Sequence, residues 1–333
     1  MKKKQIGFTL IELMISLALG LIVVAAAILL FLTGQKSVAM QKGVSELQDN
    51  ANFGLNYITK DIRLTNLNVK EAAINDQTPY GGVVLSSSNT EPKSNVYLSS
   101  AALDANLISK GNLTSNVVDS GGTAISSDQL VIQYLPQYTL DNKNTPTDET
   151  DDELVGGFDC EGQELRFSKS AGLHMVVQRY FLRTDNNKAS NEGSPLALAC
   201  DAGYYALNTP NTIVGYGGSG EIIMKRVDHF RVLLGVQSDV AAAASTPAST
   251  THQYLSIKDY MGMTAPRPRI LSIQLGALVR STQSVGAESA VKADQEFQVL
   301  GQTVKLKTTT DPKYIRQVVS QTVALRNALG ERE

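Results

Sequence analysis

The sequence predicts an α+β fold: one long amino-terminal α-helix, transmembrane over its first half, packed on an antiparallel β-sheet domain. Three observations lead to this expectation. Residues 8–32 form an apolar run with a single charge, and the following thirty residues carry apolar side chains at helical spacing. The rest of the chain contains apolar runs of strand length, without the strand–helix alternation that is typical of a parallel sheet.

The apolar run from Phe8 to Leu32 is long enough to cross a hydrocarbon layer of about 30 Å as a helix. Three lysines at positions 2–4 precede it, so the positive-inside rule keeps residues 1–7 in the cytoplasm and exports the remainder. An ordinary secretory signal would have a shorter apolar core followed by a polar stretch. Here the small residues 25–27 are followed by more apolar ones, so we expect the segment to stay with the mature chain.

The helix is expected to continue beyond the membrane, because no proline occurs before Pro79. Its apolar residues recur at spacings of three and four and share one stripe: Met40, Val44, Leu47, Ala51, Leu55, Ile58 and Ile62. We predict one helix from Phe8 to about Leu67, a rod of about 90 Å. Residues 8–34 form its transmembrane half and residues 35–67 its amphipathic half.

The exported domain is predicted to span residues 68–333. Strands are expected at 128–135, 173–184, 222–236, 267–280 and 314–326, where β-branched and other apolar residues cluster. Loops are expected at 79–127, 142–157 and 241–251, which are rich in small, polar or acidic residues, and the first of them is expected to hold short strands or turns. An antiparallel sheet packed on the second half of the helix fits this order of elements best.

Cys160 and Cys200 are the only cysteines of the chain, and both lie in the exported part. An oxidising compartment favours a disulfide between them, with two buried free thiols as the alternative. A redox site is disfavoured because the chain has no Cys-x-x-Cys spacing.

Glu12 is the one charged residue in the apolar run, where a carboxylate is costly. It either reaches the membrane interface or has a cationic partner, such as an α-amino group freed by cleavage before Phe8. The lysine-rich leader, Gly7 and the run Phe8-Thr9-Leu10-Ile11-Glu12 resemble the class III signal of type IV pilins and pseudopilins. This motif covers about a tenth of the chain.

The resemblance implies the pilin fold and several functional residues. It implies that residues 1–7 are a leader peptide, cleaved between Gly7 and Phe8 by prepilin peptidase, and that Phe8 is then N-methylated. It also implies that Glu12 pairs with the new amino terminus of a neighbouring subunit during assembly. Phe53, Tyr57 and Leu64 fall on the helix side opposite the apolar stripe. We therefore hypothesise that they meet neighbouring subunits, the alternative being scattered surface apolar residues.

Later segments are similar to PilW-type minor pilins: ITKDIRLTNL at 58–67, VDHFRVLLGV at 227–236, RPRILSIQLGALVRS at 267–281 and QVVSQTVALRNAL at 317–329. Such proteins often carry a tryptophan just before the third of these segments, and this chain has none. A J-type pseudopilin of a type II secretion system therefore remains an alternative.

The PilW resemblance implies a structural subunit that helps initiate type IV pilus assembly at or near the tip. Twitching motility, adhesion or DNA uptake would follow from that role. The implied partners are other minor and major pilins, prepilin peptidase and the inner-membrane pilus assembly machinery. The chain would cross the inner membrane once, with a cytoplasmic amino terminus and a periplasmic domain, and would reach the cell surface in the pilus.

Residue patterns of an enzyme or a cofactor site are lacking. The three histidines have no metal-ligand spacing, and no Gly-x-Ser-x-Gly elbow occurs. The acidic run at 148–153 lacks the spacing of an EF-hand, so we interpret it as a solvated loop, with calcium binding as the alternative. A net charge of −2 argues against nucleic-acid binding. A membrane-anchored periplasmic binding protein or enzyme is the remaining alternative to an assembly role.

Overall fold

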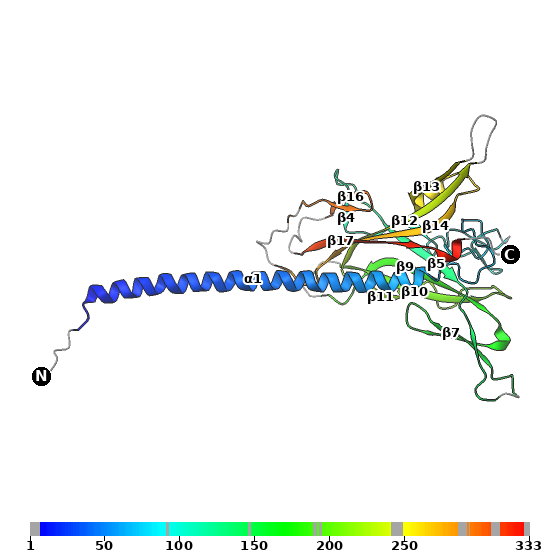
Figure 1. Ribbon diagram of the computed structural model, residues 1–333, viewed down its shortest axis with the longest axis horizontal. Coiled ribbons are helices and arrows are strands. Elements are labelled where there is room, and N and C mark those ends of the chain that lie inside the picture. Colours follow the sequence, from blue (N-terminus) through cyan, green and yellow to red (C-terminus); the bar gives the residue numbers. More distant parts are fainter. Residues whose placement is uncertain are drawn as a thin grey trace.

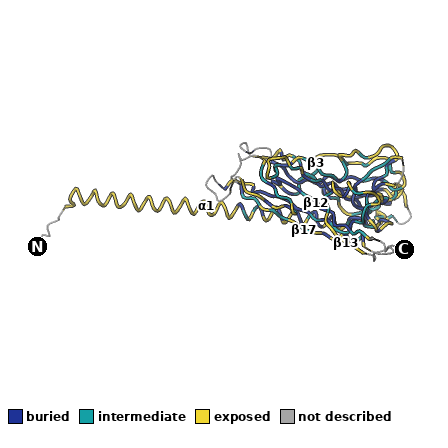
Figure 2. Tube along the Cα trace, turned by 90° about the horizontal axis from the view of Figure 1, so that it is seen from above, coloured by how far each residue is buried: buried dark blue, intermediate teal, exposed yellow. Residues whose placement is uncertain are grey.

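The computed structural model describes residues 7–90, 93–145, 148–188, 192, 195–240, 249–285, 292, 294–307 and 314–329. Helix α1, Leu10–Ile62, projects from a β-rich body, and its amino-terminal end lies far from all strands (Figure 1). Figure 2 shows that the first half of α1 is exposed and that burial begins where the helix meets the strands. The predicted α+β fold, a long helix beside antiparallel sheets, is confirmed.

Helix α1 ends at Ile62, one turn earlier than the predicted end near Leu67. Asn66 adopts a left-handed backbone conformation (φ 63°), which ends helical geometry. Its side-chain oxygen accepts a hydrogen bond from the Gly82 N–H at 2.9 Å, and its amide donates to the Asn327 carbonyl at 3.2 Å. Contacts with distant parts of the chain therefore replace the last helical turn.

The larger sheet has five strands in the order β11-β10-β9-β5-β3, and all neighbouring pairs are antiparallel. Its strands are β3 Lys110–Leu113, β5 Ser127–Tyr134, β9 His174–Thr184, β10 Leu196–Ala206 and β11 Glu221–Met224. The strands predicted at 128–135 and 173–184 are confirmed as β5 and β9. Strand β10, which lies between β9 and β11, was not predicted.

The second sheet has four strands in the order β13-β12-β14-β17. They are β12 Val227–Val240, β13 Ser249–Ser256, β14 Arg269–Arg280 and β17 Arg316–Ala324. The strands predicted at 267–280 and 314–326 are confirmed as β14 and β17. The single strand predicted at 222–236 is wrong: it is divided between β11 and β12, which belong to different sheets, because Arg226 has a left-handed backbone (φ 58°).

Smaller elements cover the two main sheets. One three-stranded sheet contains β15 Phe297–Val299, β16 Gln302–Leu306 and β4 Val117–Val118, and another contains β6 Thr139–Asp141, β7 Glu153–Phe158 and β8 Glu164–Ser168. Strands β1 Ser87–Ser88 and β2 Val96–Tyr97 form a parallel pair. The short helices are η1 Lys169–Ala171, α2 Ile257–Gly262 and η2 Arg326–Ala328.

The three predicted loops fare differently. Where the structure describes the segment 79–127, its strands are the short β1–β4, and β5 begins at Ser127. The predicted end of the loop at 142–157 is wrong, because β7 starts at Glu153 and pairs with β8. Of the segment 241–251, residues 241–248 lie outside the described residues, and the last three belong to β13.

The second half of α1 lies against both main sheets, in contact with β11, β14 and β17. One core cluster joins side chains of the helix with those of both sheets, including Ile58 of α1, Tyr180 of β9, Phe230 of β12 and Ile273 of β14. All four side chains are fully buried. The exposed half of α1 therefore projects from a firmly packed base.

Candidate assembly surface of the amino-terminal helix

The first turn of α1 contains the residues that the sequence singled out. Gly7 and Phe8 lie just before the helix, and Phe8 is 83% exposed. Thr9 is the N-cap, with its hydroxyl oxygen accepting a hydrogen bond from the Glu12 N–H at 3.3 Å. This cap starts the helix and places Glu12 in its first turn. There, the positive end of the helix dipole stabilises a negative charge.

The Glu12 carboxylate faces outward from the apolar surface of α1. Its Oε2 atom lies 3.5 Å from the Thr9 hydroxyl, and both residues are exposed. Within the part of the chain that the structure describes, no lysine or arginine forms an ion pair with Glu12. Its charge thus has no cationic partner among these residues, although apolar side chains surround it.

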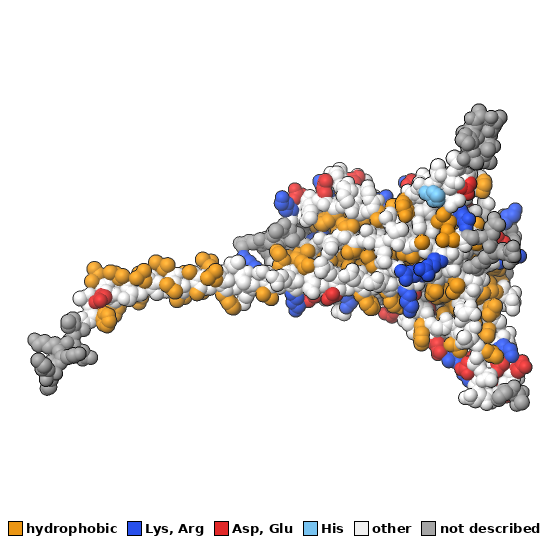
Figure 3. Space-filling view, in the orientation of Figure 1, with side chains coloured by type: hydrophobic (Ala, Val, Ile, Leu, Met, Phe, Trp, Pro, Cys, Tyr) orange, Lys and Arg blue, Asp and Glu red, His pale blue; other side chains and the backbone are white. Residues whose placement is uncertain are grey.

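The segment of α1 that precedes the β-rich body is almost entirely apolar on its surface. Figure 3 shows hydrophobic side chains along most of its visible face, with an acidic side chain near its start. None of the most apolar 18-residue stretch of α1 is buried. By length and composition, α1 is able to cross a membrane, and among the described residues it is the one helix of this kind. So large an apolar surface marks a membrane or protein contact.

The second half of α1 packs on the body through part of the predicted stripe. Leu47, Ala51, Leu55, Ile58 and Ile62 are buried, as predicted, and Val44 is partly buried. Met40 is an exception, being 36% exposed, because it lies before the point where the helix meets the sheets. Gly54 allows the closest approach: a Cβ atom built on it would lie 2.8 Å from the Cβ atom of Met224 in β11.

Polar contacts fix the same half of the helix. The Asn50 side chain binds both the carbonyl and the N–H of Lys225, at 2.8 and 3.1 Å, between β11 and β12. The Thr59 hydroxyl donates to the Gln321 side chain of β17 at 3.0 Å. The buried Asp61 carboxylate accepts a hydrogen bond from the Tyr180 hydroxyl at 2.8 Å, and burial raises its pKa. The helix and both sheets are therefore joined at several points.

The predicted second stripe, Phe53, Tyr57 and Leu64, is only partly exposed. Phe53 is 66% exposed and stacks on the Tyr57 ring at a centroid distance of 6.1 Å. Tyr57 itself turns to the body and donates its hydroxyl to the Cys160 carbonyl at 3.0 Å. Leu64 packs against a small core cluster with Tyr134 and Phe167. Of the three, Phe53 alone is available to a partner; the stripe interpretation fails for Tyr57 and Leu64.

The expected disulfide joins Cys160, which follows β7, to Cys200 in β10. Both residues are buried and belong to the main core cluster. Because Tyr57 binds the Cys160 carbonyl, the disulfide also supports the segment that touches α1.

A buried ionic cluster, which the sequence analysis did not predict, lies near the start of β12. Its arginines are Arg226, Arg280 and Arg316, and its acids are Asp185, Glu192 and Asp228. Each of the six side chains is at most 8% exposed. A buried charge that loses its partner is strongly destabilising. The ion pairs therefore fix the positions of β12, β14 and β17 relative to one another. The residues are scattered in sequence, and no local pattern could have found them.

The described residues contain no group of histidine, cysteine and acidic side chains that could hold a metal ion. His174 stacks on Phe167, and His229 is buried beside the Ser127 hydroxyl, where burial lowers its pKa to about 4. In the acidic run, Glu149 and Asp152 both bind Lys169 at 2.9 Å. Their carboxylates are thus paired with a lysine. The Glu149 side chain is exposed, as expected for a solvated loop, whereas the Asp152 side chain is buried.

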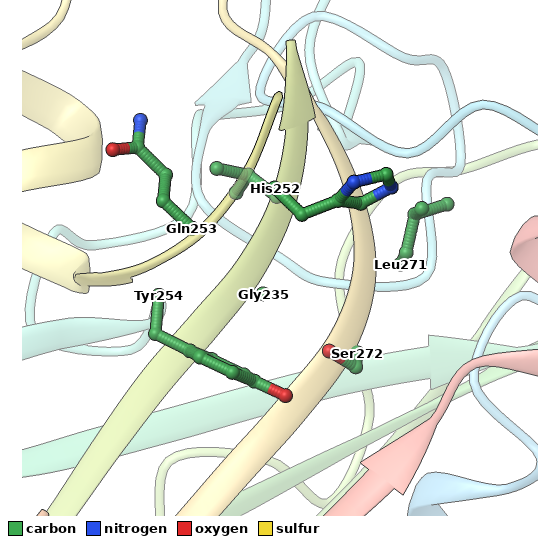
Figure 4. A pocket seen from close by; sticks show the side chains of 7 residues that line it. Gly235, His252, Gln253, Tyr254, Leu271 and Ser272 are labelled. Atoms are coloured by element: carbon green, nitrogen blue, oxygen red, sulfur yellow. The ribbon is translucent and has the colours of Figure 1, made fainter. Parts of the chain in front are cut away.

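A hollow of about 150 Å³ lies on the four-stranded sheet, over Gly235 of β12. Figure 4 shows the Tyr254 ring of β13 lying across it, with its hydroxyl directed toward Ser272 of β14. His252 and Leu271 complete its sides. The lining carries no carboxylate, lysine or arginine, so it has no permanently charged side chain to bind a phosphate, and His252 and Tyr254 are its ionisable residues.

Two family models match segments of this chain. Residues 2–28 match the family model described as prokaryotic N-terminal methylation motif, and residues 180–327 match type IV pilus-assembly protein W. Among solved structures, a type IV-like pilin from Thermus thermophilus is 9% identical, with 85% of this chain and 98% of that chain covered and a TM-score of 0.35. A comparison with curated proteins gives no match.

The apolar helix with its methylation motif defines the class: the chain is a type IV pilin-like protein. The second match, from Tyr180 in β9 to Asn327 beyond β17, is more specific: over these residues the chain is similar to PilW-type minor pilins.

Proposed function

We propose that this minor pilin helps to initiate type IV pilus assembly at or near the filament tip. The observation that carries the proposal is the division of α1. Its first half exposes an apolar surface with Glu12 near the start, and its second half is fixed to a β-sheet body. A subunit of this form can wait in the membrane and later pack its helix among those of other pilins.

The proposal divides the chain into four parts. Residues 1–7 are the leader peptide, residues 8–34 the transmembrane half of the helix, residues 35–67 its amphipathic half, and residues 68–333 the periplasmic domain. Prepilin peptidase cleaves between Gly7 and Phe8, and Phe8 is N-methylated. The accessible position of both residues before the first helical turn supports this.

Glu12 is the assembly residue in this proposal. A carboxylate in an apolar surrounding is costly unless a cation lies beside it, and a free α-amino group is equally costly alone. Pairing Glu12 with the amino terminus of a neighbouring subunit offsets both costs. The pairing thus favours addition of a subunit to the filament over its remaining alone in the membrane.

The partners in this proposal are other minor and major pilins, together with the inner-membrane assembly machinery. Head-to-tail packing of helices is a heterologous contact that does not close, and it therefore produces a filament. The domain stays in the periplasm until assembly carries it to the cell surface. Twitching motility, adhesion or DNA uptake would depend on the filament rather than on chemistry in this chain.

A deletion strain, complemented with the full chain, tests the role. We expect few surface filaments and loss of twitching, normal type II secretion, and full recovery on complementation. Normal twitching with defective secretion would instead show a J-type pseudopilin. Mass spectrometry of the complementing chain should show an amino terminus at methylated Phe8. A Glu12→Val chain that restores full function would point to a membrane-anchored binding protein or enzyme.

A further inference from the structure

The hollow on the four-stranded sheet is produced by two irregularities that lie in the same row of residues. The first is a β-bulge in β14: Gly235 of β12 pairs with Ser272, and the next residue of β12 pairs with Ile270. Leu271 is the extra residue between them. The residues on either side, Ile270 and Ile273, are fully buried, so the bulge leaves both intervening side chains on the outer face. A regular strand would turn one of the two inward.

The second irregularity is Gly235 itself. A glycine inside a strand weakens the strand, and it is typical of places where a ligand or another group approaches the backbone closely. Here an added Cβ atom would clash with the Ser272 hydroxyl and would lie 2.9 Å from Cε1 of Tyr254. Any larger residue at this position would therefore fill the hollow, and the glycine keeps it open.

The side chains around the hollow combine an aromatic ring with unpaired hydrogen-bonding groups. The Tyr254 ring is 49% exposed and lies across the hollow, and the His252 ring lies toward Leu271 (Figure 4). Among the residues that the structure describes, the side chains of His252, Tyr254 and Ser272 have no hydrogen-bond partner. Both hydroxyls are able to donate and to accept, and the imidazole has one nitrogen for each role when it is neutral.

The surroundings of the hollow favour an uncharged ligand. No carboxylate, lysine or arginine lines it. Further along the same strands, Arg269 donates a hydrogen bond to the Ala328 carbonyl, and the Asp239 carboxylate accepts hydrogen bonds from Gln237 and Thr250. These charges are thus engaged within the chain. A phosphate or another anion would meet no cation in the hollow, which disfavours nucleic acid and acidic polymers.

We propose that the hollow binds one ring of a neutral saccharide. The C–H face of the sugar packs on the Tyr254 ring, and the sugar hydroxyls exchange hydrogen bonds with Tyr254, Ser272 and His252. The volume of about 150 Å³ is below the roughly 300 Å³ at which typical small-molecule sites begin. The hollow therefore takes a single ring, with millimolar affinity, and leaves the rest of a glycan in solvent.

The place of the hollow in the fold makes this inference independent of the proposed function. Figure 1 shows β13 at the edge of the body, on the side away from α1. Saccharide binding needs the folded body and Tyr254, whereas assembly needs α1 and Glu12. Each activity can therefore be lost while the other remains.

Saturation-transfer difference NMR tests the binding directly. The full chain is placed in phosphatidylcholine nanodiscs, which carry no sugar head group, and is mixed with the methyl glycosides of glucose, galactose, mannose and N-acetylglucosamine. We expect transfer to the C–H protons of one ring face of at least one glycoside. Less transfer is expected to the methyl glycoside of sialic acid, which carries a carboxylate. No transfer to any of the four neutral glycosides, or stronger transfer to sialic acid, would overturn the proposal.

Substitutions locate the site through the dissociation constant of the bound glycoside. Tyr254→Ala should weaken binding at least tenfold because the ring is lost, and Gly235→Ala should abolish it because the methyl group fills the hollow. The matched controls are Phe158→Ala, at another exposed aromatic residue, and Gly262→Ala, at a glycine with no atom within 4 Å of its added Cβ position. Both should bind as the wild type does. Unchanged binding by Tyr254→Ala, or an equal loss in Phe158→Ala, would contradict the site.

Thermal melting separates loss of the site from loss of the fold. Tyr254→Phe and Ser272→Ala each remove only a hydroxyl, so they should melt as the wild type does and bind several-fold more weakly. If both bind as tightly as the wild type, neither hydroxyl contacts the sugar and the proposal fails.

Incorporation into filaments separates this inference from the proposed function. Tyr254→Ala should enter filaments as the wild type does. Loss of incorporation with unchanged glycoside binding would show that the hollow is a contact between subunits, and would overturn the inference. A wild-type chain that binds the glycoside but never enters filaments would refute the proposed function alone.

Discussion

Replacement of Gly54 by alanine tests how α1 packs on the body. In an exposed helix, glycine to alanine stabilises by about 1 kcal/mol, because alanine restricts the unfolded chain and favours the helix. Gly54 is buried, however, and an added Cβ atom would lie 2.6 Å from Cε and 2.8 Å from Cβ of Met224. The Cβ atom of Met224 is fixed by the β11 backbone, so relief requires movement of the helix.

The expected loss follows from these distances. Overpacking of a dense core costs about 1–3 kcal/mol, and the upper part of that range applies where the opposing atom cannot rotate away. After subtraction of the gain in helix propensity, we expect Gly54→Ala to lower the free energy of unfolding by about 1–2 kcal/mol. The measurement is urea unfolding of the full chain in detergent, followed by circular dichroism.

Two further variants complete this test. Gly34 has no atom within 4 Å of its added Cβ position, so Gly34→Ala should not destabilise the chain. Met224→Ala removes the outer atoms of the clash, so Gly54→Ala should cost less in that background, with a coupling of at least about 0.5 kcal/mol. If Gly54→Ala behaves like Gly34→Ala, the helix does not cross β11 as described.

Three other predictions concern different parts of the molecule. Replacing Cys160 and Cys200 by serine should lower the free energy of unfolding by about 4 kcal/mol, the chain-entropy value for a loop of 40 residues. Reduction of the wild type should lower its melting temperature, and an unchanged melting temperature would contradict a structural role for the disulfide. Burial raises the pKa of Asp128 to about 6, so its contribution to stability is present below about pH 4 and lost as the pH rises through 6. The free energy of unfolding of Asp128→Asn, relative to that of the wild type, should therefore rise between pH 4 and pH 7 by at most about 3 kcal/mol, which denaturation at both pH values will measure. The same difference between variant and wild type at both pH values would contradict the burial of Asp128. Phe53→Asp should change the unfolding free energy by less than about 0.5 kcal/mol, as expected for an exposed site, yet reduce incorporation into filaments; equal losses of folding and assembly would refute a contact role.

Much of the fold follows from local patterns in the sequence. The buried stripe from Leu47 to Ile62 was predictable because helical spacing needs only the order of apolar residues. Strands β5, β9, β14 and β17 are rich in β-branched residues, which favour extended structure. Strand β10 was not predicted because its sequence, LALACDAGYYA, is rich in alanine and contains no β-branched residue. Its place in the sheet comes from pairing with β9 along its whole length, a contact that local propensity does not encode.

Tertiary contacts decide the remaining features of the site. The helix ends early because Asn66 bonds to Gly82 and Asn327, residues that are distant in sequence. Tyr57 turns toward the body because the Cys160 carbonyl lies within reach of its hydroxyl, which periodicity alone could not indicate. The leader, Phe8 and Glu12 were recognisable because their pattern is local, but what they contact depends on other chains.

The presence of this chain in purified filaments tests the account most directly. Filaments are sheared from cells that express either the wild-type chain or Glu12→Val, and the chain is quantified in the filament and membrane fractions. We predict wild type in both fractions and Glu12→Val in the membrane fraction alone, because the variant retains its apolar helix but lacks the carboxylate that pairs with a neighbour. Equal amounts of both chains in filaments, or no wild-type chain there, would contradict the account.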